Sequence, residues 1–185
     1  YKIYQITDKI PSTITCQVSD PEITLGELIG VTGQISPSPG EAGIGVSVEL
    51  IPPEGDTIYR ATLANVNGEF AYQVQCDDIT KAGAWSVRTS WAGTGPYVGA
   101  VSDPVSLTVA TANARITVDS TYQAIKFGET VDISGKFTPQ PDCGRDLSGI
   151  PLKVYITKPD QSVTVLDVVT SDMYGHYVVQ DYAGM

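Results

Sequence analysis

Apolar and polar residues alternate along most of this chain, in short runs separated by turn-forming residues. In one such run Val46, Val48 and Leu50 alternate with Ser47 and Glu49. A period of two is typical of a β-strand that buries one face. Apolar residues at helical spacing are not sustained over successive turns in any segment, so we expect an all-β protein with many short strands.

One stretch of this pattern occurs twice. Residues 26–39 begin with Gly-Glu at a predicted turn and continue as a strand with alternating apolar residues. This strand contains Gly33, and the stretch ends in Pro-x-Pro. Residues 128–141 repeat these features, with Gly135 at the place of Gly33. Such self-similarity indicates a tandem array of one module. We therefore predict an N-terminal strand or linker and two β modules, at residues 1–11, 12–110 and 111–185.

The first module is predicted to form a two-sheet sandwich. Asn65-Val66-Asn67-Gly68 separates two of its strands, and Asn-Gly supplies the positive φ of a tight turn, so residues 57–76 are predicted to form a β-hairpin. Short antiparallel strands at this spacing can bury both inner faces of a sandwich. The predicted strands are residues 13–18, 28–36, 46–50, 57–64, 69–76, 84–91 and 105–109.

The second module repeats the first strands of this plan but not its last two. Counterparts of residues 85–109 are missing from the sequence, so we expect an incomplete sandwich with an open sheet edge. Either the native protein continues, or another strand fills the gap; residues 1–6 of a neighbouring molecule could do so by strand addition. Residues 1–11 are otherwise the last strand of a preceding module or, as we favour, a linker. The predicted strands are residues 116–118, 131–137, 152–157, 163–169 and 177–180.

Residues 83–109 carry a resemblance to a known family. Residues 83–93 read Gly-x-aromatic-x-Val-x-x-x-aromatic-x-Gly, followed by Tyr97 and a Val-rich strand at 105–109. In these features the chain resembles the bacterial and archaeal immunoglobulin-like (Big-type) repeats of exported surface proteins, although Thr94-Gly95-Pro96 departs from their commonest form. The resemblance implies tandem immunoglobulin-like β-sandwiches of about seven antiparallel strands, the second one incomplete. It also implies an extracellular, cell-surface or periplasmic location.

Charge and hydropathy narrow the range of partners. The net charge is −10, and most of it falls in residues 12–110. An acidic surface without a basic stripe argues against nucleic acid and anionic membranes as partners. Because no apolar run approaches the length of a membrane span, direct membrane insertion is not expected either.

The residue types needed for catalysis are sparse. The single histidine, His176, occupies the position of Glu69 in the repeat, where strand alternation points it to solvent. We therefore expect no enzyme, no catalytic residue and no bound cofactor. The count of three cysteines is odd; Cys16 corresponds to a valine in the second module, which indicates a small buried hydrophobe. A disulfide between Cys16 and Cys76 is left open, and Cys143 lies in a loop.

Two weak sets of candidate ligand-binding residues remain. Loop carboxylates could hold calcium and rigidify a module junction. Zinc-ligand spacing and an Asp-x-Asp-x-Asp-Gly loop are both absent, however, and solvated loop acids are the alternative. Aromatic residues could stack on sugar rings. The calcium candidates are Asp20, Glu22, Asp77 and Asp78, and the aromatic candidates are Trp91, Tyr97 and Tyr59.

The function that these observations favour is mechanical. The modules are predicted to be non-catalytic spacer repeats of a prokaryotic cell-surface or secreted protein, with other modules of the same protein as their partners. The alternative is an adhesin or carbohydrate-binding module that recognises a surface glycan or protein.

Overall fold

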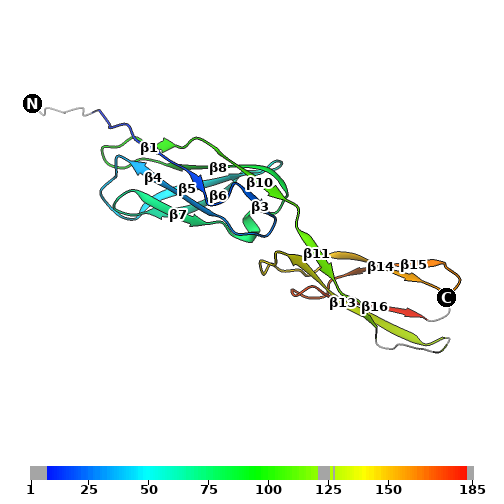
Figure 1. Ribbon diagram of the computed structural model, residues 1–185. Helices are drawn as coiled ribbons and strands as arrows, with labels where there is room; N and C mark the ends of the chain where they lie inside the picture. The colour runs from blue at the N-terminus through cyan, green and yellow to red at the C-terminus, as the bar shows by residue number, and fades with distance from the viewer. Residues whose placement is uncertain (1–7, 121–125, 127, 183–185) are drawn as a thin grey trace, which may run out of the picture. The chain divides into compact units, whose positions relative to one another are not determined.

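The computed structural model describes residues 8–120, 126 and 128–182 (Figure 1). The predictions made for residues 1–6 therefore lie outside the described residues. The chain divides into two compact units, Tyr1–Thr111 and Ala112–Met185. The described residues of these units are called module 1 and module 2 below, and each is considered by itself.

The smaller sheet of module 1 is built on β4 (Gly30–Ser36), which pairs antiparallel with β7 (Glu69–Gln73) and with an N-terminal strand. That strand has two parts, β1 (Thr13–Ile14) and β2 (Gln17–Val18). Both parts keep one register, because Thr13 faces Ser36 and Gln17 faces Thr32. The predicted strand at 69–76 ends earlier, since Cys76–Asp78 forms a turn of 3₁₀ helix.

The larger sheet of module 1 has the strand order of an immunoglobulin-like sandwich. Its first and last strands in sequence, β3 and β10, run parallel, and the other pairs are antiparallel. The sequence pattern did not predict the short strands β3 and β9. The order across the sheet is β3 (Glu22–Thr24), β10 (Val105–Ala110), β8 (Gly83–Trp91), β5 (Ile44–Ile51) and β6 (Ile58–Ala64), with β9 (Ala100–Val101) beside β8.

The predicted hairpin at residues 57–76 is wrong. β6 pairs with β5 and β7 pairs with β4, so the intervening turn carries the chain from one sheet to the other. The turn itself forms: Gly68 has a φ of 78°, and the Asn65 Oδ1 accepts hydrogen bonds from the N–H groups of Asn67 and Glu69. Asn-Gly chemistry thus determines that the chain turns, whereas burial of the apolar faces decides which strands pair.

Two apolar clusters fill the space between the sheets of module 1. The larger lies around Trp85, Val87 and Leu107, and the smaller around Trp91, Phe70 and Ile35. Val31, Val48, Leu50 and Val87 have no exposed surface. Burial of alternate residues on facing strands is what the sequence periodicity predicts.

Module 2 repeats the framework of module 1 in the same registers. Asp119 faces Ser134 as Gln17 faces Thr32, and the sheet partners of β13 correspond to those of β4. The second sheet contains only β14 and β15 within the described residues, so the prediction of tandem β-sandwiches with an incomplete second member is confirmed. The strands are β11 (Asn113–Ile116), β12 (Asp119–Ser120), β13 (Thr130–Gln140), β14 (Pro151–Thr157), β15 (Val163–Val169) and β16 (His176–Tyr182).

Candidate functional site

One carbonyl group in module 1 points into the sandwich instead of joining its strand ladder. The N–H of Gln34, which faces Thr15, donates to the Thr15 hydroxyl at 2.9 Å. The Thr15 carbonyl oxygen instead accepts a hydrogen bond from the Thr89 hydroxyl of β8 at 3.1 Å. A Cβ at Gly33 would lie 2.0 Å from this oxygen and 2.4 Å from the Phe70 ring. The repeated glycine is therefore required by the inward carbonyl and the ring beside it.

Module 2 contains the same arrangement with a different hydroxyl. Lys136 donates its N–H to the Thr117 hydroxyl at 3.0 Å, and a Cβ at Gly135 would lie 1.9 Å from the Thr117 carbonyl oxygen. Here the Tyr177 hydroxyl donates to that oxygen at 2.7 Å. Tyr177 occupies the place of Phe70, so the aromatic residue at this position also satisfies the carbonyl. Burial, together with the nearby Asp119 charge, raises the pKa of the Tyr177 phenol.

Asp78, one of the calcium candidates, is a buried structural carboxylate. Its side chain is 2% exposed and accepts hydrogen bonds from the Arg60 Nε at 2.7 Å, the Tyr72 hydroxyl at 3.1 Å and the Gln75 N–H at 2.9 Å. The pKa of Tyr72 is raised, first by burial and then by the hydrogen bond and charge of Asp78. The oxygens of Asp78 are thus committed to groups that fix the connection between β7 and β8.

The other calcium candidates are exposed. Asp20 accepts the N–H of Glu22 at 2.9 Å in a local turn, and Asp77 lies on the surface of the 3₁₀ turn. Among the described residues there is no group of three or more His, Cys, Asp or Glu side chains that could hold a metal ion. Calcium binding stays a prediction, without a donor set assembled for it.

The three aromatic candidates do not form one platform. Trp91 is 5% exposed, lies in the smaller core cluster and donates its Nε1–H to the Ser12 hydroxyl at 3.2 Å. Tyr97 is half-buried and packs against the same cluster. Tyr59 is 61% exposed and faces the opposite side of the larger sheet. Glycan stacking by these residues stays a prediction, and Tyr59 is the one whose ring is available to solvent.

A shallow hollow of about 510 Å³ lies on the larger sheet of module 1. Small residues dominate its lining, and the exposed side chains of Tyr59 and Leu63 project from β6 on the outer face of the same sheet. Beside it, the buried Glu49 accepts a hydrogen bond from the Arg88 Nε at 2.5 Å. The hollow is lined by Gly45, Val46, Ser47, Ala61, Ser90, Trp91, Ala92 and Val101.

Cys16 of module 1 is a thiol packed against the core. Cys16 is a free cysteine, half-buried against the larger core cluster, and its Sγ lies 3.8 Å from the Val87 carbonyl oxygen. Burial raises the pKa of this thiol, which favours its protonated form. The interpretation of Cys16 as a small hydrophobe agrees with this packing.

His176 takes part in a surface turn. Its Nδ1 lies 2.7 Å from Asp172 Oδ2, and the other Asp172 oxygen accepts the N–H groups of Tyr174 and His176. The hydrogen bond to His176 is the main cause of the lowered pKa of Asp172. In module 1 the corresponding pair is Asn65 and Glu69, with an Nδ2–Oε2 distance of 2.9 Å. His176 thus completes a turn that in module 1 is completed by Glu69.

Helices long and apolar enough to span a bilayer are absent from the part of the chain that the structure describes.

Comparison with known proteins gives structural neighbours only. No protein-family model and no curated protein matches the sequence. Solved structures similar to the chain include a tetra-tandem repeat in the extending region of a large adhesion protein, with 11% identity and a TM-score of 0.49 over 94% of this chain. A 1.5-MDa bacterial ice-binding adhesin has 17% identity and a TM-score of 0.38 over 94%. A chicken TCR has 10% identity and a TM-score of 0.38 over 91% of this chain and 89% of its own.

The chain spans 40% of the first of these neighbours and 55% of the second. The first two neighbours are adhesin regions, and the assignment of the fold rests on the strand order of the chain itself.

Proposed function

We propose that these modules are non-catalytic structural repeats that act as spacers in an exported surface protein. The observation that carries the proposal is what the chain repeats: strand registers, the inward carbonyl with its glycine, and the glycine turn between the sheets. All of these features serve packing and turn geometry. Sequence divergence elsewhere leaves this framework intact, which is how an array of independently folded modules is built.

The connection between the modules supports the same proposal. β10 ends at Ala110 and β11 begins at Asn113, so only Thr111 and Ala112 lie between two strands. A two-residue connection without glycine has few accessible conformations, which limits bending between modules. An extended array needs this property at each junction.

A scattering experiment tests the spacer proposal. Small-angle X-ray scattering of the full chain is compared with that of a variant carrying a Gly-Ser-Gly-Ser insertion between Thr111 and Ala112. We expect the insertion to broaden the distribution of dimensions, because it frees a junction that was restricted. Indistinguishable profiles would contradict the proposal, since the natural junction would then already bend freely.

One observation favours a second candidate function, recognition of a surface glycan or protein. Exposed Tyr59 and Leu63 stand on the same sheet face as the hollow in module 1, and small side chains there leave room for a ligand. Titration of the full chain against surface glycans and cell-wall polymers, with and without calcium, separates the two functions. Saturable binding lost in Tyr59→Ala, but kept in the matched exposed-tyrosine variant Tyr155→Ala, would establish the adhesin function. A spacer gives no saturable binding.

A further inference from the structure

The turn between β6 and β7 contains the one Asn-Gly pair of the sequence, Asn67-Gly68. The backbone nitrogen that follows an asparagine can attack the carboxamide carbon of its side chain, and glycine obstructs this approach least because it has no Cβ. Asn67 is exposed, and among the described residues none forms a hydrogen bond with its carboxamide. Asn67 therefore has both the neighbour and the surroundings that spontaneous deamidation requires.

The other two asparagines of the chain lack these properties. Asn65 uses its whole carboxamide, because Oδ1 accepts the N–H groups of Asn67 and Glu69 while Nδ2 donates to the Glu69 carboxylate. It is also followed by Val66, whose β-branched side chain hinders the approach of the backbone nitrogen. Asn113 lies in β11, and the pairing of β11 with β13 restrains the backbone rotation that the reaction needs.

The folded turn restrains the attacking nitrogen of Gly68. The Gly68 N–H donates to the Asn65 carbonyl oxygen at 2.9 Å, and the Gly68 carbonyl oxygen accepts the N–H of Ile35 at 2.9 Å. Asn65 Oδ1 holds the backbone on both sides of this nitrogen, at distances of 2.9 Å from the Asn67 nitrogen and 3.0 Å from the Glu69 nitrogen. The Gly68 nitrogen must leave this arrangement to reach the side chain, so opening of the turn sets the rate.

We propose that Asn67 is a site of spontaneous deamidation and that the Asn65 side chain controls its rate. The Gly68 nitrogen forms a bond to Asn67 Cγ, the Cγ–Nδ2 bond breaks, and Nδ2 leaves as ammonia with the proton of the Gly68 amide. Water then opens the succinimide ring at one of its two carbonyl carbons. The product is aspartate or isoaspartate at position 67, and the reaction consumes no oxidant or reductant.

The two products differ in their effect on module 1. Aspartate keeps the backbone of the turn and adds one negative charge, whereas isoaspartate carries the main chain through the side chain and lengthens it by a methylene group. The site of Gly68 has little room for a displaced backbone: a Cβ there would lie 2.6 Å from the Ile35 oxygen, and Ile35 is 1% exposed. Isoaspartate therefore separates Gly68 from β4 and loosens the crossing between the two sheets.

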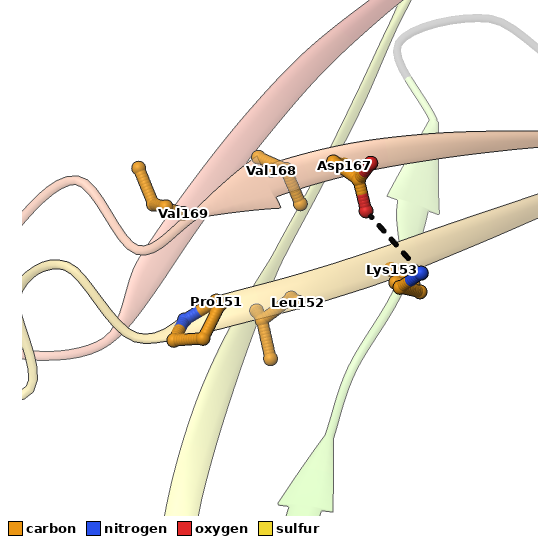
Figure 2. Close-up of a pocket in the computed structure, with 6 residues that line it drawn as sticks. All are labelled: Pro151, Leu152, Lys153, Asp167, Val168 and Val169. Atoms are coloured by element: carbon orange, nitrogen blue, oxygen red, sulfur yellow. Dashed lines mark ion pairs between the residues drawn. The ribbon is translucent and has the colours of Figure 1, made fainter.

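Module 2 builds the equivalent turn without this chemistry. Its β15 ends at Val169, beside a hollow of about 550 Å³ (Figure 2), and the chain then turns at Gly175. The Gly175 N–H donates to the Asp172 carbonyl oxygen at 3.1 Å, but the residue before this glycine is Tyr174, which has no carboxamide. Asp172 Oδ1 accepts the N–H groups on both sides of Gly175, so an aspartate takes the role of Asn65 there.

Ageing of the full chain tests the proposal. The chain is kept in mildly alkaline buffer at physiological temperature, and peptide mapping by mass spectrometry follows the gain of about 1 Da that accompanies the exchange of NH₂ for OH. Enzymatic methylation measures the isoaspartate fraction. We expect conversion at Asn67 but not at Asn65 or Asn113. Conversion should be at least about fivefold slower than in a peptide of residues 61–72, which lacks the folded turn.

Two substitutions at one position isolate the role of Asn65. Asn65→Ala removes the acceptor that holds the turn and should speed conversion of Asn67 by at least about threefold. Asn65→Asp keeps this acceptor, as Asp172 does in module 2, and should leave the rate within about twofold of that of the parent chain. Tryptophan fluorescence reports whether each variant keeps module 1 folded. If Asn65→Ala is unfolded, the comparison of the parent chain with the peptide decides alone.

Several outcomes would overturn the proposal. An unchanged Asn67 in the chain, under conditions in which the peptide converts, would exclude it as a modification site. Equal rates in chain and peptide, or in the parent and a folded Asn65→Ala, would remove the control by the turn. The isoaspartate form, separated by chromatography, should unfold at a lower urea concentration than the parent, whereas Asn67→Asp should unfold near it. Equal midpoints for these two forms would contradict the predicted displacement of Gly68.

Discussion

The two modules satisfy one inward carbonyl group in different ways, and the difference shows which part of the framework is fixed. In module 1 the donor is Thr89, on the opposite sheet. In module 2 the donor is Tyr177 of β16. This strand pairs with β13, and β13 also pairs with the strands on either side of Thr117, so the donor lies in the same sheet as the carbonyl. Two features are the same in both modules. A glycine lies next to the inward carbonyl, and the threonine hydroxyl accepts the backbone N–H that this carbonyl would otherwise bond in the strand ladder. A buried acceptor needs a donor, but the fold does not dictate which element supplies it.

This comparison shows how the first sheet of module 2 is held together within the described residues, among which there is no counterpart of β8. A phenylalanine at residue 177 would leave the Thr117 carbonyl dependent on a strand that the described part of module 2 does not contain. With tyrosine, the hydrogen bond is made within the sheet that is present. Both tryptophans lie in module 1 and the only histidine lies in module 2, so each module has its own spectroscopic reporter.

The largest effect is expected where the modules are alike. Gly33→Ala should destabilise module 1 by about 3 kcal/mol or more, because the new Cβ would overlap the Thr15 oxygen and the Phe70 ring. Urea unfolding followed by tryptophan fluorescence measures this. Gly45→Ala is the control, since a Cβ there meets no atom within 4 Å. Equal stability of the two variants would show that the glycine is not required by the carbonyl.

A smaller effect should distinguish the modules by burial. Val48→Ala removes two buried methyl groups from a fully enclosed site and should destabilise module 1 by about 2 kcal/mol. Val154→Ala, at the equivalent but half-buried site, should cost module 2 less than about 1 kcal/mol. Tryptophan fluorescence and the His176 NMR signals, respectively, follow the two transitions in urea. Similar losses would mean that the face of β14 is as well covered as that of β5.

The exchanged hydroxyl donors give the next prediction. Tyr177→Phe should destabilise module 2 by about 1 kcal/mol, because the Thr117 oxygen loses its donor. The reciprocal change Phe70→Tyr should not stabilise module 1, where Thr89 already donates to the Thr15 oxygen. Unfolding of each variant is compared with the parent chain. A gain in stability from Phe70→Tyr would contradict the assignment of Thr89 as the sufficient donor.

The smallest effect concerns pH. The pKa of Asp172 lies below its ordinary value of 3.8, so the ionised carboxylate favours the folded turn above that value, and this contribution is lost as the pH falls through the folded pKa. The stability difference between the parent chain and Asp172→Asn should therefore shrink as the pH falls below about pH 4. The His176 NMR signals report it. Asn65 cannot titrate, so module 1 should lack this contribution from its corresponding position.

Strand positions could be predicted well from the sequence because they follow from local periodicity. The predicted strands at 84–91 and 163–169 match β8 and β15 within one residue. The same local information gave the turn at Asn65 to Gly68 but not the pairing of the strands around it. Pairing depends on contacts between distant residues, and here both flanking strands had closer partners in β4 and β5.

The roles of individual polar residues could not be predicted from the sequence. Asp78 stands next to Asp77 in what reads as an acidic loop, yet it is buried by Arg60 and Tyr72, which come from two other strands. Trp91 alternates with outward-facing residues, as a buried strand residue does, but its sequence context did not show that Ser12 would meet its indole N–H. Such contacts are set by the packing of the whole sandwich.

The parallel pairing of β3 with β10 has a mechanical consequence. These strands are close in sequence to the two ends of module 1, and their edge carries hydrogen bonds from Thr108 to the Pro21 carbonyl at 2.8 Å and from Leu25 to the Ala110 carbonyl at 2.9 Å. A tension applied to the two ends pulls parallel neighbours in opposite directions along their length. Their hydrogen bonds are then loaded in shear and must break together rather than one after another. We therefore expect loading in shear to be the consequence of this parallel pairing once tension has passed β1 and β2, which are tied to β4 ahead of β3.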